Sequence, residues 1–335
     1  MSGGHVEQAQ ASAQAGFLRR RDESGAAIGP ALPLSWGRTT AAQPTAHHIP
    51  LPLSGLQWIT QANLPQHYDF KRFYHEYLRP LRGGFVIRGC NPAQAHFLAA
   101  QGVRVARIGC EALVDLHGPG MQRHAVQKMV RQAARQGHVH ELPWSSEAAV
   151  ALQELVQRSR YGARPQLRHL FRTAFTPDTR LFVFDGTNGA RHGALLISQP
   201  QPQLAVTELM LRVPSAPGGV MESLFRSVAT RLRSEGVRTL SLNEVPFQLE
   251  AADIGGWERL IQAGAMMLHG AYNAAGLQHF KAKFAPQWRP AYLCAAPQIS
   301  LQLLIDLFVA SGCLRLTTHH AFQVVRARSI TFLHN

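Results

Sequence analysis

Short apolar runs alternate with helical patterns along most of the chain. Residues 70–81 predict a helix, residues 84–88 a strand, and Pro92 opens a second helix that Gly102 ends. The apolar stretch 103–116 predicts further strands. Because helices and strands in alternation are typical of α/β units, we expect this part of the chain to form one.

The pattern is clearer in the second half of the chain. Apolar runs at 181–185 and 194–198 flank a glycine-rich turn, and 204–213 predicts a third strand. Residues 220–234 repeat apolar side chains every three or four positions, which predicts a helix with one buried face, and 237–242 returns as a strand. This arrangement resembles a GNAT (N-acetyltransferase-like) domain. We therefore expect an α/β fold of tandem GNAT domains, with mixed sheets flanked by helices and a first copy that is abbreviated.

These elements divide the chain into four parts. Residues 1–50 are rich in Ala, Gly, Gln, Pro and Ser, which predicts a disordered or loosely ordered arm. A basic cluster, Arg19–Arg21, leaves open a contact of this arm with phosphates or lipids. Residues 51–140 are expected to form the first GNAT-like domain, residues 141–300 the second and catalytic one, and residues 301–335 a C-terminal helix and tail.

Composition and charge narrow the function classes. Of the 335 residues, 46% are apolar and 16% charged, which excludes a wholly disordered chain. Lys and Arg number 34 against 20 Asp and Glu, and the resulting net charge of +14 favours nucleic acid or anionic lipid as a partner. No apolar run reaches the roughly 18 residues of a spanning helix. Residues 299–309 predict a helix that packs on the core, with a membrane-surface contact as the alternative.

Few residues point to catalytic or metal chemistry by themselves. The sequence has no GxSxG, HExxH or Walker loop, and its four cysteines lie far apart without a CxxC. We therefore expect a reduced, cytoplasmic setting and no metal site. Cys110 is expected in the core, and the pairs His47–His48 and His319–His320 at the surface.

Glycine-rich and basic segments are the candidate anion sites. Gly218 and Gly219 precede the helix at 220–234, whose first N–H groups could receive a phosphate or a carboxylate. A flexible start to the helix is the alternative. Two basic stripes either follow a phosphate backbone or are solvated faces. They are Lys128, Arg131 and Arg135, then Arg160, Arg164, Arg168 and Arg172, the second interrupted by Pro165.

Five strings of residues keep their order and spacing over about residues 60–300. They are RIGCEALVDL at 107–116, the helix through 126–137, ELM at 208–210, PSAPGGVME at 214–222, and YNAAGLQHFKAKF at 272–284 with Trp288, Arg289, Pro290 and Tyr292 beyond it. Together they resemble the C-terminal domain of phosphatidylglycerol lysyltransferases, the catalytic part of the multiple peptide resistance factors.

The resemblance implies an aminoacyltransferase with two substrates. It implies that an amino acid passes from aminoacyl-tRNA to the headgroup of a membrane lipid such as phosphatidylglycerol. No cofactor is implied, because the aminoacyl ester is already activated. The partners would be aminoacyl-tRNA and an anionic membrane lipid, touched peripherally at the inner face of the cytoplasmic membrane. The oligomeric state stays open.

The resemblance also assigns roles to residues. The implied catalytic residues are Glu208, Lys281 and Arg212. The implied substrate-binding residues are Gly218, Gly219, Glu244, Tyr272, Asn273 and Lys283. The implied tRNA- or lipid-binding residues are Lys128, Arg131, Arg135, Arg164 and Arg168. One departure stands out: Leu211 occupies the position of the family's arginine, and Arg212, one step further, would point to the other face of a strand.

Two alternative functions remain open at this point. One is an acyltransferase that uses acyl-coenzyme A, and the other is a diverged homologue that binds tRNA or anionic lipid without turnover. A cavity that holds Glu208, Arg212, Lys281 and Lys283 together would indicate an enzyme. A Glu208 that is sealed in a structural ion pair without a pocket would favour the binding homologue. As a separate alternative, Lys281 and Lys283 are ordinary surface lysines next to a core Phe280 and Phe284.

Overall fold

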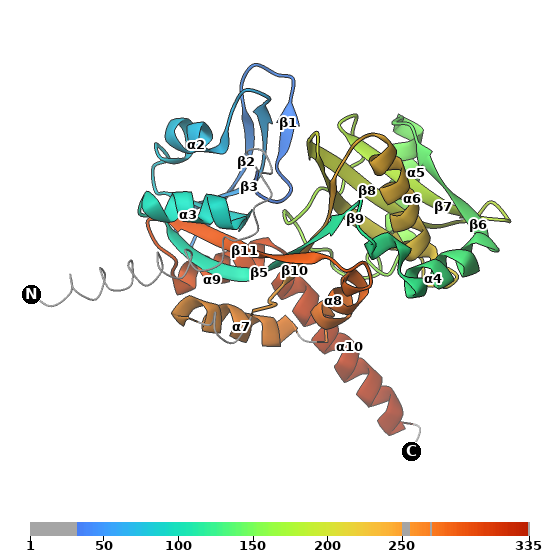
Figure 1. Cartoon of the computed structure of the whole chain (residues 1–335). Helices are drawn as coiled ribbons and strands as arrows, with labels where there is room; N and C mark the ends of the chain where they lie inside the picture. The colour runs from blue at the N-terminus through green and yellow to red at the C-terminus, as the bar shows by residue number, and fades with distance from the viewer. Residues whose placement is uncertain (1–31, 250–254, 269, 334–335) are drawn as a thin grey trace, which may run out of the picture.

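The computed structural model describes residues 32–249, 255–268 and 270–333 of the chain. The strands form one sheet in the order β1-β3-β4-β11-β5-β10-β9-β8-β7-β6, and β2 pairs with β3 (Figure 1). The strands are β1 (Gly37–Thr39), β2 (Thr45–Pro50), β3 (Gln57–Pro65), β4 (Phe85–Cys90), β5 (Arg104–Asp115), β6 (Gly137–Leu142), β7 (Thr179–Gly186), β8 (Arg191–Gln201), β9 (Leu204–Arg212), β10 (Thr239–Pro246) and β11 (Gln287–Ala296). The helices are α2 (Phe70–Phe73), α3 (Pro92–Ala100), α4 (His124–Ala134), α5 (Ser146–Arg158), α6 (Val220–Ser234), α7 (Gly256–Leu268), α8 (Ala274–Ala282), α9 (Leu301–Ala310) and α10 (Cys313–Leu333).

The sheet is continuous because β10 has a partner on each side. It pairs antiparallel with β5 and, over Thr239–Ser241, parallel with β9. Beyond Ser241 the register between β10 and β5 shifts, and Asn243 takes a positive φ of 67°. Strand β11 lies between β4 and β5, so a late segment of the chain completes the first half of the sheet, which consists of β1 to β5 with β11. Strands β6 to β9 form the second half.

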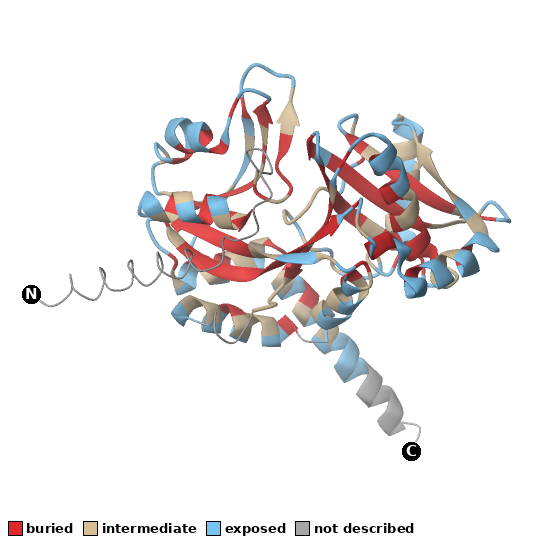
Figure 2. Cartoon of the chain, viewed as in Figure 1, coloured by how far each residue is buried: buried red, intermediate tan, exposed pale blue. Residues whose placement is uncertain are grey.

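Helices cover both faces of each half. In the first half, α2 and α3 pack on one face and α7 and α9 on the other. In the second half, α4 and α6 cover one face and α5 the opposite one. Figure 2 shows the sheet as the buried layer between these helices. Of the five apolar side chains whose spacing predicts the buried face of α6, four are fully buried and Met221 is partly buried. The four are Leu224, Phe225, Val228 and Leu232.

The expected α/β class, with a mixed sheet flanked by helices, is confirmed. Two local expectations need correction. The helix predicted over 70–81 is one α-turn followed by a π-helical turn, Tyr74–Leu78, and Pro80 cannot donate the hydrogen bond that would extend it. Residues 103–116 are expected to form several strands but form the single strand β5. The mixed sheets expected for the two domains are joined into one continuous sheet.

The N-terminal arm and the second basic stripe also differ from expectation. Residues 1–31 lie outside the described residues, but β1 and β2 belong to the sheet and Trp36 is 1% exposed, so a loose arm is wrong for residues 37–50. Helix α5 ends at Arg158, so the arginines from Arg160 to Arg172 share no helical face. The expected burial of Cys110 in a strand is confirmed.

Within the described part of the chain, no single helix is long and apolar enough to cross a bilayer. The bent pair Leu301–Ala310 and Cys313–Arg326 meets the test by length and composition alone.

Gly219 allows α4 and α6 to pack closely. Its φ is +90°, and a Cβ atom there would lie 2.1 Å from the carbonyl oxygen of Met129 in α4. The neighbouring Gly218 faces the side chain of Gln132 in the same helix. Close approach of two helices therefore explains why the chain has glycine here, independently of any anion at the start of α6.

We predict that Gly219→Ala destabilises the protein by about 3 kcal/mol, since left-handed strain and a backbone clash add. Gly236→Ala is the matched control: its φ is +82°, but no atom lies within 4 Å of a Cβ there. The control should lose about 1 kcal/mol from strain alone. Denaturant unfolding of both variants measures the difference, and equal losses would contradict the packing argument.

Candidate active site between the two halves of the sheet

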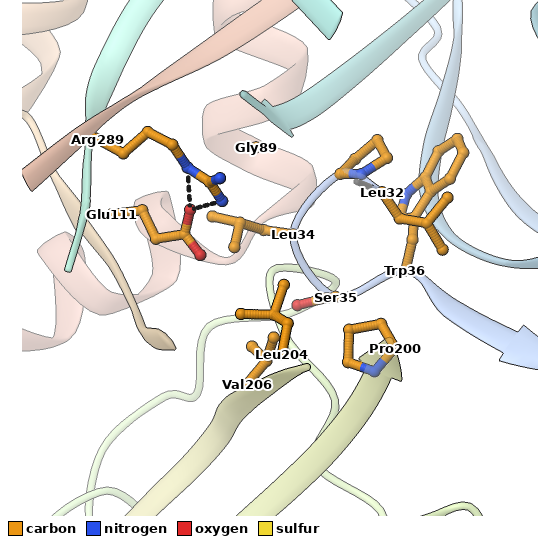
Figure 3. Close-up of a pocket in the computed structure, with 11 residues that line it drawn as sticks. Leu32, Leu34, Ser35, Trp36, Gly89, Glu111, Pro200, Leu204, Val206 and Arg289 are labelled. Atoms are coloured by element: carbon orange, nitrogen blue, oxygen red, sulfur yellow. Dashed lines mark hydrogen bonds and ion pairs between the residues drawn. The ribbon is translucent and has the colours of Figure 1, made fainter. Parts of the chain in front are cut away.

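A small pocket lies where the two halves of the sheet meet (Figure 3). The cavity measures about 10 Å³, roughly the room of one water molecule, and part of it is open to solvent. The N-terminal segment 32–36 forms one wall, Glu111 and Arg289 form another, and Leu204 and Val206 of β9 close the third. Apolar walls with a few polar groups are typical of small-molecule sites, so this pocket is the candidate active site.

A buried ion pair forms the polar wall of the pocket. Glu111 of β5 and Arg289 of β11 lie directly opposite each other in the sheet. The Nε and Nη2 atoms of Arg289 donate to Glu111 Oε2 over 3.0 and 2.5 Å, and Ser241 Oγ donates to Oε1 over 2.6 Å. The Glu111 side chain is 4% exposed. A carboxylate that is so deeply buried is stable only with such partners.

Glu208 lies behind the opposite wall of the pocket. It has no partner across β8, because the pairing of β8 with β9 shifts register around it, as in a β-bulge. Its carboxylate accepts from Ser198 Oγ over 2.6 Å, from Ser35 Oγ over 3.2 Å and from the backbone N–H of Arg172 over 3.1 Å. Burial raises the pKa of Glu208, and these donors partly offset the shift. Ser35 lines the pocket and Glu208 does not, so the hydroxyl group of Ser35 is the link between Glu208 and the pocket.

The loop between α5 and β7, residues 159–178, crosses from the second half of the sheet to the first. Arg172 anchors it: its guanidinium donates to Asp178 over 2.6 Å, to the carbonyl of Ser35 over 3.3 Å, and to Asn63 of β3. This crossing segment and the N-terminal segment therefore hold each other next to Glu208. From its spacing in the sequence, Arg172 is predicted to belong to a basic stripe. Its anchoring role is visible only in the tertiary contacts.

Lys281 is buried below the distorted part of β10. It is 1% exposed, and its ammonium donates to the carbonyls of Asn243 and Glu244 over 3.1 and 2.9 Å. Asn243 lies in the register shift of β10, and Glu244 is the first residue that pairs with β5 after it. Burial lowers the pKa of Lys281 to about 7, although the nearby Glu244 raises it. Lys281 therefore supports the distortion and titrates near neutral pH.

Glu244 and Tyr272 lie near Lys281. Glu244 Oε2 is 2.6 Å from Arg88 Nη2 of β4, and burial raises the pKa of this carboxyl group against the effect of Arg88. Burial also raises the pKa of Tyr272 to about 12, with Glu244 as a further cause. The expected substrate-binding residues Glu244 and Tyr272 are thus close to Lys281, but none of the three lines the pocket.

The other expected site residues are more scattered. Arg212 is exposed on β9, whereas Leu211 is buried, as the one-step displacement predicts. Lys283 is half-exposed and pairs with Glu222 of α6 over 2.9 Å. Asn273 caps α8 by accepting from the N–H of Gly276 over 2.7 Å.

The basic residues expected to bind tRNA or lipid are exposed. Lys128 and Arg131 lie on α4, and Arg135 caps its end. Arg164 and Arg168 lie on the crossing segment, where Arg164 donates to the carbonyl of Ala271 over 3.4 Å.

The structure therefore does not bring Glu208, Arg212, Lys281 and Lys283 into one cavity. The pocket instead contains Glu111 and Arg289, which sequence reasoning did not select as site residues. A signal was available: Glu111 is a charged residue within the mostly apolar stretch 105–114, and Arg289 follows Trp288 in the last of the five strings. Charges within a buried strand indicate a partner that spacing along the chain cannot identify.

Comparison with known proteins identifies the family. Residues 69–295 match the family described as phosphatidylglycerol lysyltransferase, C-terminal. The chain belongs to this family. The match covers β4, β5 and β11, and with them both Glu111 and Arg289.

A curated relative and two solved structures extend the comparison. The chain is 24% identical over 225 residues to the lysylphosphatidylglycerol biosynthesis bifunctional protein LysX of Mycolicibacterium vanbaalenii, which covers 62% of this chain and 20% of the relative. The chain thus spans about a fifth of that relative's length. L-PGS from Bacillus licheniformis has a TM-score of 0.60 at 18% identity, covering 80% of this chain and 85% of its own. A C-terminal domain (DUF2156) from Agrobacterium fabrum has a TM-score of 0.57 at 21% identity, covering 81% and 86%. Both structures share the fold.

The pKa of Lys281 predicts how stability depends on pH. The folded pKa of about 7 lies below the ordinary lysine value of 10.5, so between these values the unfolded chain binds more protons. This residue's contribution to the free energy of unfolding should therefore rise with pH across that window, by roughly 1 kcal/mol per pH unit.

Unfolding experiments between pH 6 and pH 10 test this in the variant Lys281→Met. The difference in slope between wild type and variant isolates the titration from the loss of two hydrogen bonds. Lys128→Met is the control, because the Lys128 side chain is exposed on α4. Identical slopes in all three proteins would show that Lys281 is charged throughout.

Proposed function

We propose that this chain transfers an amino acid from aminoacyl-tRNA to a hydroxyl group of an anionic membrane lipid such as phosphatidylglycerol. The observation that carries the proposal is the Glu111–Arg289 pair in a pocket at the junction of the two halves, in a chain of this family. The relatives named for lysylphosphatidylglycerol biosynthesis support the lipid as acceptor.

The reaction sets three requirements on the pocket. The lipid hydroxyl oxygen attacks the ester carbon, the bond to the tRNA ribose breaks, and the hydroxyl proton passes to the departing ribose oxygen. The protein must align the two substrates, donate hydrogen bonds to the oxyanion and hold the amino acid's ammonium group. No metal or organic cofactor enters these steps, because the ester is already activated.

We assign these tasks to the groups that line the pocket. Arg289 offers N–H donors to the oxyanion, and Glu111 holds its guanidinium in place. The Ser35 hydroxyl donates a hydrogen bond to Glu208, so the Ser35 oxygen can accept one from the ammonium group. In this proposal Glu208 and Lys281 are positioning residues: Glu208 orients Ser35, and Lys281 supports β10 next to Glu111.

We predict that Arg289→Lys lowers the rate of lipid aminoacylation by about 100-fold, because lysine loses the planar fork of donors. The assay supplies purified protein with labelled aminoacyl-tRNAs and phosphatidylglycerol vesicles, and it measures label in the lipid fraction.

Arg180→Lys is a closely matched control. Like Arg289, Arg180 donates from Nε and Nη2 to a glutamate, here to both oxygens of Glu141 over 2.6 and 2.8 Å, and it also pairs with Glu235. Its exposure of 21% is close to the 20% of Arg289. It does not line the pocket. Equal activity in both variants would show that the active site is not at Arg289. If no aminoacyl-tRNA gives a lipid product with the wild type, the proposed transferase activity is wrong.

The exposed stripe on α4 is the proposed tRNA contact. Among the described residues no carboxylate pairs with Lys128, Arg131 or Arg135, so their charges are available to phosphates. We predict that the double variant Arg131→Gln, Arg135→Gln binds tRNA more weakly and lowers the salt slope of log K by about 1.5. Filter binding at several salt concentrations measures it. Arg79→Gln with Arg82→Gln, both exposed on the first half, should leave the slope unchanged.

One observation favours a second candidate, a homologue that binds tRNA or lipid without turnover. Glu208 is fully engaged by Ser198, Ser35 and Arg172, and the pocket next to it is small because residues 32–36 occupy much of the space. Salt-sensitive tRNA binding without lipid product would support this candidate.

A further inference from the structure

Helix α9 presents an apolar stripe to solvent. Leu301, Ile305 and Val309 follow one another at four-residue steps and are 56%, 43% and 50% exposed. The opposite face packs on the core through Leu303. Gln302 is the remaining exposed position of the helix. A helix at a protein surface ordinarily exposes charged side chains to water, but no charged side chain of α9 is exposed.

The acidic residue of α9, Asp306, does not interrupt the apolar stripe, because its side chain is buried. Asp306 is 4% exposed and accepts hydrogen bonds from the N–H groups of Leu53 and Ser54 and from the Ser54 hydroxyl, over 2.8 to 3.2 Å. These bonds fix the turn before β3 against α9. The Leu53 side chain on that turn is 58% exposed. The buried acid thus holds a further leucine next to the stripe.

Helix α10 continues the apolar surface. It begins at Cys313, meets α9 at an angle of 67°, and projects from the body of the molecule (Figure 1). Leu314, Phe322 and Val325 are 42%, 65% and 62% exposed. Every residue from 321 to 326 is exposed, as the pale blue part of α10 in Figure 2 shows. Six successive residues cover all sides of a helix, so this part of α10 is exposed to solvent on every side.

The end of α7 adds two methionines. Met266 and Met267 are 72% and 61% exposed. A Cβ atom at Gly270, just beyond α7, would lie 2.7 Å from the ring of His320 in α10, so the end of α7 lies against α10. Together, the exposed side chains of α9 and α10, Leu53 and the two methionines form a surface that we call the apolar–basic surface.

The charges of this surface have one sign. Between residues 299 and 326 the exposed charged side chains are Arg315 and Arg326, with His319 and His320 half-buried next to them. The acid in this range, Asp306, is buried in its hydrogen bonds. Exposed aliphatic and aromatic side chains together with cations are what the interface of an anionic bilayer attracts.

We propose that the apolar–basic surface docks on an anionic lipid bilayer. The inference deepens the proposed function, on which it rests for its purpose, because docking would hold the protein at the membrane that contains its acceptor. Aliphatic side chains of α9 and Phe322 would enter the acyl boundary, and the arginines would lie among the headgroups. A second copy of the chain is the competing occupant, and the experiment separates the two.

Vesicle flotation with the full chain tests the proposal. The vesicles contain phosphatidylcholine alone or phosphatidylcholine mixed with phosphatidylglycerol. The wild type should float with the anionic vesicles and much less with the neutral ones. The double variant Ile305→Glu, Val309→Glu should lose binding by about tenfold or more, because it places anions in the apolar boundary.

A matched control excludes a general effect of added charge. Val150 of α5 is 55% exposed, close to the 50% of Val309, and lies in the second half of the sheet. Val150→Glu should bind anionic vesicles as the wild type does. Thermal unfolding of all variants checks that exposed substitutions leave the fold intact.

Each other outcome overturns the proposal. A double variant that still binds anionic vesicles would place the membrane contact elsewhere. A wild type that ignores vesicles but is a dimer in sedimentation equilibrium, and a monomer when Ile305 and Val309 are replaced by glutamate, would assign the surface to a second copy.

Catalysis is measured separately, with a short-chain phosphatidylglycerol dissolved below its micelle concentration. The docking-deficient variant should aminoacylate this soluble lipid at the wild-type rate and lose activity on vesicles. If the wild type binds vesicles but modifies neither lipid, the proposed function fails and the docking surface stands.

Discussion

The pairing of β10 with a neighbour on each side is the constraint on which the structure depends. Through it the two halves share one sheet, and the pocket lies where they meet. Strand β10 does not pair with both β5 and β9 along its whole length. It follows β9 as far as Ser241 and then shifts its register against β5 at Asn243. Everything proposed for catalysis lies around this point.

The shift in β10 has an electrostatic consequence. Buried carbonyl groups need hydrogen-bond donors, and the ammonium of Lys281 donates to the carbonyls of Asn243 and Glu244 at the cost of its own hydration. Its pKa falls toward neutrality for that reason. Perturbed pKa values are common at active sites, but here a backbone requirement explains the shift by itself. The pH experiment and the activity assay therefore address different questions.

Buried carboxylates are the second feature of the junction. Glu111 and Glu208 lie on either side of the pocket, and each is stabilised differently, the first by an arginine and the second by hydrogen bonds from hydroxyl and amide donors. The two sets of partners come from strands, from the crossing segment and from the N-terminal segment. A substrate that enters here meets groups whose positions several distant parts of the chain determine together. This is the preorganisation that transition-state stabilisation needs.

Much of the architecture could be read from the sequence. The helix at 220–234 and the strands around it follow from apolar spacing, since a face that repeats every three or four residues must be buried. The family followed from five strings in order, and the match over 69–295 confirms it. The division into tandem GNAT-like units and the roles of Glu208, Lys281 and Arg212 stay predictions.

Tertiary structure alone decided which residues meet. Glu111 and Arg289 are far apart in the chain and become opposite neighbours only because β11 inserts next to β5. Ser35 reaches Glu208 only because the N-terminal segment joins the sheet. Local spacing determines which face of an element is buried, because that depends on neighbouring residues. Contacts between distant strands depend on topology, which no local pattern contains.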